Sequence, residues 1–192
     1  MAPLGAARFG LGGGLVDNGK LELIETIDMA GSSTFTFSDL GSYKMHKLTL
    51  NNYVPFNNGS MSALVCEVSS NGGSSYYTSG YEYSYEYAGQ ALGGDARSAT
   101  ASGIVIGPYI NDEGFGGDCL EFMGLVSSSE YLYYSFHSMD YRGDNVYSGN
   151  AITVFGSGVL QQTVAMDTLK LNDPLGNCTS GTLSLYGYSD TV

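Results

Sequence analysis

Positive charge is scarce in this chain. Its 192 residues include 7 Lys and Arg against 19 Asp and Glu, which gives a net charge of -12 at pH 7. A chain of this charge repels a phosphate backbone, whereas a nucleic-acid-binding protein carries a basic patch that displaces counterions. We therefore expect no nucleic-acid partner.

Long apolar runs are also missing. No stretch approaches the roughly 20 apolar residues that cross a bilayer. Residues 1–14 carry Gly-interrupted apolar residues, without the run of about 7 to 15 apolar residues found in secretory signals. We expect a protein made in the cytosol that has no membrane partner.

Cysteine is rare, and the spacing of the three cysteines is not that of a metal site. Cys66, Cys119 and Cys178 are odd in number, lie far apart and form no C-x-x-C pair. This pattern predicts neither a disulfide framework nor a zinc site. Free cysteine is among the most buried residue types, so we expect buried thiols.

Catalytic signatures are absent as well. The only histidines are His46 and His137, and the chain contains no G-x-S-x-G, H-E-x-x-H or phosphate-binding glycine loop. Ser135 and His137 would point the same way on a strand, with no evident oxyanion donor. We expect no enzyme and no cofactor, although a pair of carboxylates that hydrolyses glycosides would be invisible in the sequence.

Two acidic loops contain oxygen ligands of the kind that Ca²⁺ takes. The first loop, Asn111 to Gly114, precedes Asp118, and a second group comprises Asp140, Asp144 and Asn145. Neither spacing fits a known calcium loop, and Asp and Asn are also common turn residues. The prediction is that no metal binds.

The residues that are plentiful favour β-structure. The chain has 28 Gly, 16 Tyr and 8 Phe, is 43% hydrophobic and only 14% charged. Aromatic and β-branched residues favour strands, and glycines favour tight turns. Because ordinary domains contain about 150 residues, we expect one domain with one core.

Short apolar runs separated by turn residues follow one another from Lys20 onward. Phe35 and Phe37 alternate with Thr, and Leu21, Leu23 and Ile27 are expected on the buried face of the first strand. The remaining runs lie in 48–50, 61–68, 76–87, 103–110, 118–126, 131–139, 151–155, 163–171 and 182–188. An Asn71-Gly72-Gly73 turn predicts a hairpin between the runs on either side of it.

These ten or eleven strands, without a helical pattern longer than two turns, predict an all-β fold. Unequal strands and long connections, such as Ala88 to Ser102, favour a jelly-roll-like antiparallel β-sandwich over a closed barrel. We assign residues 19–192 to this sandwich. Residues 1–18 have no strand or helix period and are assigned to an extended N-terminal arm.

The N-terminal arm needs a surface to hold it, because a Gly-rich terminus orders only where something ties it down. We expect a neighbouring molecule, or the rest of this chain, to hold it. The residues predicted to bind this partner are Pro3, Leu4, Arg8, Phe9 and Leu11.

A tyrosine ladder is the candidate ligand face. Tyr81, Tyr83, Tyr85 and Tyr87 alternate with Glu82, Ser84 and Glu86, so a strand places all four rings on one face. Such a face either stacks on sugar rings or packs in the core, and the charges on the opposite side favour the core.

Several motifs, taken in order, resemble those of a set of tailed-bacteriophage virion proteins. They are L-E-L-I-E-T at 21–26, S-T-F-T-F at 33–37, V-S-S-N-G-G-S-S-Y at 68–76 and S-G-T-L-S-L-Y-G at 180–187. The likeness spans Lys20 to Tyr188 and is loose between Ala88 and Gly149. It implies a β-sandwich displayed on a virion, commonly as a trimer, on the head or at the tip of a tail fibre.

The two locations make different demands on the chain before its first strand. A fibre subunit needs an attachment region and a shaft, and about 18 residues reach at most ~60 Å. We therefore expect a capsid decoration, or cement, protein whose partners are the major capsid protein and copies of itself. The alternative is a tail-fibre tip that recognises a host surface glycan.

Overall fold

The chain folds into two antiparallel β-sheets. The computed structural model describes residues 20–55, 62–89, 93–110, 116–142 and 150–189. The strands in these ranges are β1 Lys20–Asp28, β2 Thr34–Phe37, β3 Met45–Val54, β4 Ser62–Ser69, β5 Tyr81–Gly89, β6 Gly93–Ala101, β7 Ile104–Ile110, β8 Gly116–Met123, β9 Leu132–Arg142, β10 Asn150–Leu160, β11 Thr168–Asn172 and β12 Ser180–Ser189.

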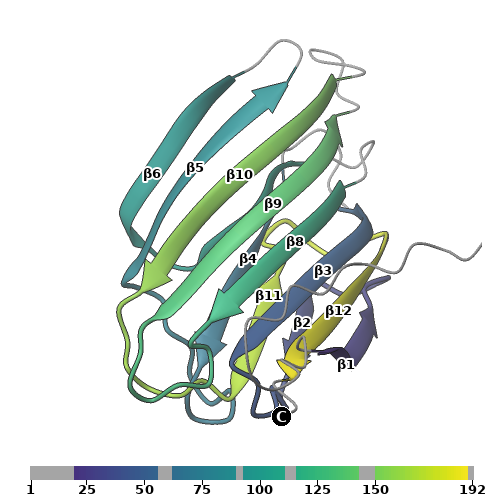
Figure 1. Cartoon of the computed structure of the whole chain (residues 1–192). Helices are drawn as coiled ribbons and strands as arrows, with labels where there is room; N and C mark the ends of the chain where they lie inside the picture. The colour runs from purple at the N-terminus through teal and green to yellow at the C-terminus, as the bar shows by residue number, and fades with distance from the viewer. Residues whose placement is uncertain (1–19, 56–61, 90–92, 111–115, 143–149, 190–192) are drawn as a thin grey trace, which may run out of the picture.

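The sheets differ in size. The large sheet has eight strands in the order β1-β12-β3-β8-β9-β10-β5-β6, and the small sheet has four in the order β2-β11-β4-β7. The small sheet lies behind part of the large one, and β5 and β6 extend beyond it (Figure 1). Neither sheet closes into a barrel.

The strand order is that of a jelly roll with two additions. Strands β1, β3, β8 and β12 lie in the large sheet, and β2, β4, β7 and β11 lie in the small sheet. The chain thus passes from one sheet to the other between β1 and β2, β3 and β4, β7 and β8, and β11 and β12, as in a double-sheet jelly roll. The pairs β5-β6 and β9-β10 extend the large sheet. The predicted jelly-roll-like sandwich is confirmed.

The core lies between the sheets, where alternate residues of each strand meet. The large sheet contributes Leu48, Leu120 and Leu185, and the small sheet contributes Phe37 and Leu169, all at most 2% exposed. Alternation puts one face of each strand inside. The opposite face of the large sheet, called the outer face below, is turned away from the small sheet.

Two glycines in β10 make room for aromatic rings of β9. A Cβ on Gly156 would lie 2.4 Å from the Phe136 ring, and one on Gly158 would lie 2.4 Å from the Tyr134 ring. Glycine inside a strand commonly marks such a close approach. Tyr134 and Phe136 therefore lie flat beneath β10 on the core side.

The hairpin predicted around Asn71 is wrong. Gly72 and Gly73 do adopt positive φ, so the turn exists. However, β4 pairs with β7 and β11, whereas β5 pairs with β6 and β10. Residues 70–80 instead connect the two sheets, and β5 begins only at Tyr81 because its partners lie in the large sheet.

The expectation that Leu21 and Leu23 are buried is also wrong. They are 42% and 58% exposed, and the pairing of β1 with β12 shifts between Leu23 and Glu25. An extra residue in one strand moves the following side chains to the other face. Ile27 packs against the core as expected, and Ile24 does so as well.

Candidate functional site

The outer face of the large sheet displays large hydrophobic side chains. The following are between 42% and 60% exposed on this face: Leu21, Leu23, Met123, Tyr133, Met139 and Phe155. Scattered exposed hydrophobics are normal, but contiguous patches mark interaction sites. The outer face is therefore the candidate functional surface.

The pairing register places three of these residues, Leu21, Met123 and Tyr133, in one row across the sheet. Leu21 pairs with Tyr188, Tyr188 with Met45, Met45 with Met123, Met123 with Tyr133, and Tyr133 with Val159. Paired residues in an antiparallel sheet project on the same face. The row thus crosses six neighbouring strands, from edge strand β1 to β10.

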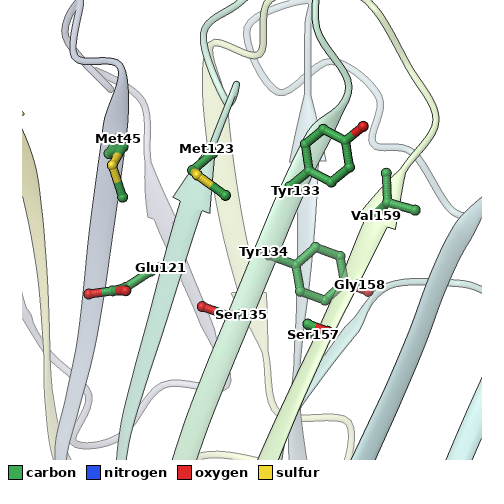
Figure 2. A pocket seen from close by; sticks show the side chains of 9 residues that line it. All are labelled: Met45, Glu121, Met123, Tyr133, Tyr134, Ser135, Ser157, Gly158 and Val159. Carbon is green, nitrogen blue, oxygen red and sulfur yellow. The ribbon is translucent and has the colours of Figure 1, made fainter.

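A groove lies on this row. It has a volume of about 390 Å³ and is lined by Met45, Glu121, Met123, Tyr133, Tyr134, Ser135, Ser157, Gly158 and Val159. Figure 2 shows that these residues come from β3, β8, β9 and β10. We call it the outer groove. Its walls are the large apolar side chains. Ser135 and Ser157, which pair across β9 and β10, form its floor, and their side chains are too small to fill it.

One carboxylate provides charge in the outer groove. Glu121 Oε1 accepts hydrogen bonds from Lys47 Nζ at 3.5 Å and from the Tyr188 hydroxyl at 3.2 Å. The hydrogen bonds from its neighbours position the carboxylate, and an exposed pair of this kind adds little stability. The groove therefore offers apolar walls and one positioned carboxylate, which already forms an ion pair with Lys47 at its edge through Oε1.

Next to the groove, an imidazole stacks on an aromatic ring. His137 and Phe155 face each other across β9 and β10, with ring centroids 4.5 Å apart and planes at 12°. Both are exposed on the outer face. Ser135 and His137 thus share a face, as predicted, and the stack gives His137 a packing partner.

Burial disfavours the reactive thiolate form of the three cysteines. Burial raises the pKa of the Cys119 thiol, although Lys47 beside it opposes the rise. Burial also raises the pKa of Cys66, and it raises that of Cys178 to about 12. Because the thiolate is the reactive form, these thiols are inert at neutral pH. Cys66 and Cys178 are buried free thiols, as expected, and Cys119 is half-buried.

The tyrosine ladder of β5 faces the core side. Tyr81 is fully buried, and Tyr83, Tyr85 and Tyr87 are partly buried against the core. Tyr83 and Tyr85 stack at 5.6 Å between centroids, and Tyr85 meets the edge of Phe136 at 6.1 Å. The ladder therefore forms a packed stack at the margin of the sandwich. Ligand binding by its exposed edges stays a prediction.

Of the two acidic groups, the structure describes Asp118 on β8 and Asp140 on the neighbouring strand β9. Asp118 pairs with Ser138, and Gly116 pairs with Asp140. Asp118 and Ser138 are buried, whereas Asn111 to Gly114, Asp144 and Asn145 lie outside the described residues. Among the residues that are described, no group of three or more ligands is placed to hold a metal ion.

The N-terminal arm, with Pro3, Leu4, Arg8, Phe9 and Leu11, lies outside the described residues. The outer groove was missed by sequence reasoning, because its walls come from four strands and each residue alone looks ordinary. The exposed methionines were the available signal: Met45 and Met123 sit at alternate, outward positions of their strands, where polar residues are usual.

The comparisons with known proteins found no relative. No protein-family model matches the chain, and neither a curated protein nor a solved structure matches it. Within the ranges that the structure describes, no helix has the length and apolar character needed to span a membrane.

Proposed function

We propose that this chain is a structural protein of a tailed-bacteriophage virion, and specifically a capsid decoration protein. The observation that carries the proposal is the exposed apolar row on the outer face. A sheet face of this kind is typical of a surface that another protein covers. The sequence resemblance supplies the class of assembly, a phage particle.

The strands that carry the resembling motifs are neighbours in the fold. L-E-L-I-E-T lies in β1 and S-G-T-L-S-L-Y-G in β12, and these two strands pair. S-T-F-T-F reaches β2, which joins β4 through β11 in the small sheet. The motifs therefore belong to both sheets of one framework. This supports a shared fold with that set of proteins.

In the proposed role, the protein stabilises the capsid through the area of its contacts with neighbouring proteins. Interfaces of roughly 800 Å² per partner hold proteins together without any chemistry. The outer face would lie against the major capsid protein or a second copy of this chain, and the arm would add contacts. Assembly as a trimer and exchange of arms between copies are part of this proposal.

Gold-labelled antibodies on intact virions test the proposal. The particles are those of the phage whose genome encodes this sequence, and the expected result is gold spread over the head. Gold confined to the tail would contradict head decoration. Particles without any label, with the protein detected in the lysate, would contradict a virion role.

A second candidate function is glycan recognition at a fibre tip. The stacked rings of Tyr83 and Tyr85, which are only partly buried, favour it because sugars stack on tyrosine faces. Binding on a glycan array that Tyr83→Ala abolishes, with the unfolding midpoint measured alongside, would support this function. A protein that binds no glycan would contradict it.

A further inference from the structure

We propose that the outer groove is the seat of the N-terminal arm of the same chain, with Phe9 and Leu11 against its methionine walls and Arg8 beside Glu121. This contact goes beyond the virion role, and it does not depend on whether the chain belongs to a phage. In the free protein it gives the outer groove an occupant that the chain itself supplies, and it leaves Met139 and Phe155 of the outer face exposed for the neighbouring protein proposed above.

The chemistry of the arm matches the groove. Within residues 1–16, Arg8 is the only charged side chain, and Leu4, Phe9 and Leu11 are apolar. The groove is walled by Met45, Met123, Tyr133 and Val159, with Glu121 as its fixed charge. Methionine and tyrosine side chains adapt to apolar partners, and the guanidinium suits a carboxylate. An apolar segment with one positive charge therefore fits this groove.

The place where the arm joins the sandwich also fits. The first strand begins at Lys20, and Leu21 is the first member of the row that leads through Tyr188 and Met45 to Met123. Strands in a sheet lie about 4.8 Å apart, so the centre of the groove is three to four strands, or roughly 14–19 Å, from β1. Asp17, Asn18 and Gly19, directly before β1, are residue types common in turns.

The length between Leu11 and β1 matches this span. Residues 12–19 include Gly at 12, 13, 14 and 19, and a glycine-rich linker of this length has a mean end-to-end distance of roughly 14–17 Å. Effective concentration is highest where the linker length equals the span. The groove of the same chain is therefore favoured over the groove of another copy in the free protein.

Methyl NMR of methionine-labelled full-length protein tests the proposal. Met45 and Met123 report on the groove, and Met139, which is 60% exposed on the outer face but does not line the groove, is the matched control. The double variant Phe9→Ala/Leu11→Ala should shift the methyl signals of Met45 and Met123 and leave that of Met139 in place. The control variant Leu15→Ala/Val16→Ala removes similar apolar surface from the linker and should move none of the three signals.

A charge pair sharpens the test. Arg8→Gln should shift the signals of Met45 and Met123 in the wild-type background and leave them unmoved in the Glu121→Gln background. If the methyl signals of Met45 and Met123 do not shift in the variants at positions 8, 9 and 11, the proposal is overturned. Shifts that disappear when the protein is diluted would overturn it as well, because they would assign the groove to the arm of another copy.

Discussion

The Tyr134 hydroxyl donates a hydrogen bond of 2.9 Å to the Glu82 backbone oxygen. Tyr134 is on β9 and Glu82 on β5, with β10 between them. The ring reaches across because Gly158, which pairs with Tyr134 in β10, has no side chain. A single glycine thus lets one tyrosine join three strands on the side that extends beyond the small sheet.

Gly158→Ala should destabilise the sandwich. The added Cβ would lie 2.1 Å from the Glu82 backbone oxygen and 2.4 Å from the Tyr134 ring, and the backbone atom has no room to move. We expect a loss of about 3 kcal/mol in the free energy of unfolding, at the upper end for overpacking. Urea unfolding followed by circular dichroism measures it.

Gly117→Ala is the matched control. Gly117 also lies in a strand, but a Cβ there meets only the Leu50 backbone oxygen, at 3.7 Å. It should change stability by less than about 0.5 kcal/mol. Equal losses in the two variants would show that the close approach at Gly158 is not what limits the packing.

Tyr81→Phe should weaken the connection between the sheets. The Tyr81 hydroxyl accepts a hydrogen bond of 3.1 Å from the Val68 backbone N–H, so this side chain of β5 completes the bonding of β4. Without the hydroxyl, the buried N–H loses its partner, which costs about 1–3 kcal/mol. Thermal unfolding measures the loss.

Tyr83→Phe controls for the removal of a tyrosine hydroxyl from the same strand. No hydrogen bond joins the Tyr83 hydroxyl to another residue in the described ranges, so its loss should leave the midpoint nearly unchanged. If Tyr81→Phe is as stable as Tyr83→Phe, the hydrogen bond to Val68 contributes nothing.

His46 should make stability fall as the pH is lowered. Burial lowers its pKa below the ordinary value of 6.5, against the smaller opposing effect of its bond to Leu40. Nε2 lies 2.7 Å from the Leu40 backbone oxygen, so Nε2 holds the proton, and Nδ1 has no hydrogen-bond partner in the described structure. Between the folded pKa and 6.5, the unfolded chain binds more protons than the folded chain, so acid favours unfolding.

Unfolding of wild type and of His46→Gln between pH 5 and 8 measures this effect. The free energy of unfolding of wild type should fall below pH 6.5 more steeply than that of the variant, by at most about 1.4 kcal/mol per pH unit. Identical slopes for wild type and His46→Gln would contradict the assignment to His46.

The exposed hydrophobic side chains of the outer face beyond the groove should govern association and leave stability unaffected. Met139→Ser and Phe155→Ser change side chains that are 60% and 58% exposed, and surface changes of this kind alter stability by about 0.5 kcal/mol or less. If the outer face is an assembly surface, the double variant should associate more weakly with itself in sedimentation velocity runs.

Val164→Ser/Leu175→Ser is the control for that experiment. Both side chains are exposed, and both lie in connections that flank β11, outside the outer face. This variant should associate like wild type. Association that drops equally in both double variants would point to general surface hydrophobicity.

The sequence predicted strands well where one face is apolar. Phe35 and Phe37 alternate with threonines, and the structure buries both. The sequence predicts a long connection from Ala88 to Ser102, but Gly93 to Ala101 within it form β6, an edge strand. Edge strands beyond the second sheet have little core to face, so they carry no apolar alternation.

The side to which a strand turns its apolar residues was harder to predict. Leu21 and Leu23 alternate as core residues do, but a shift in register puts them outside. Alternation of apolar and polar residues shows that the two faces of a strand differ, but it does not show which face the second sheet covers. The outer groove shows the same limit: Met45 and Val159 are 114 positions apart in the sequence, and only the order of the strands brings them together.

A cryo-EM reconstruction of the virion tests the central claim, that this sandwich is a virion component held through its outer face. The account predicts density for the two-sheet sandwich on the head, with Met139 and Phe155 of the outer face covered by a neighbouring protein and the outer groove filled by the N-terminal arm. A head whose density contains no such sandwich, or one in which the outer face points into solvent, would contradict it.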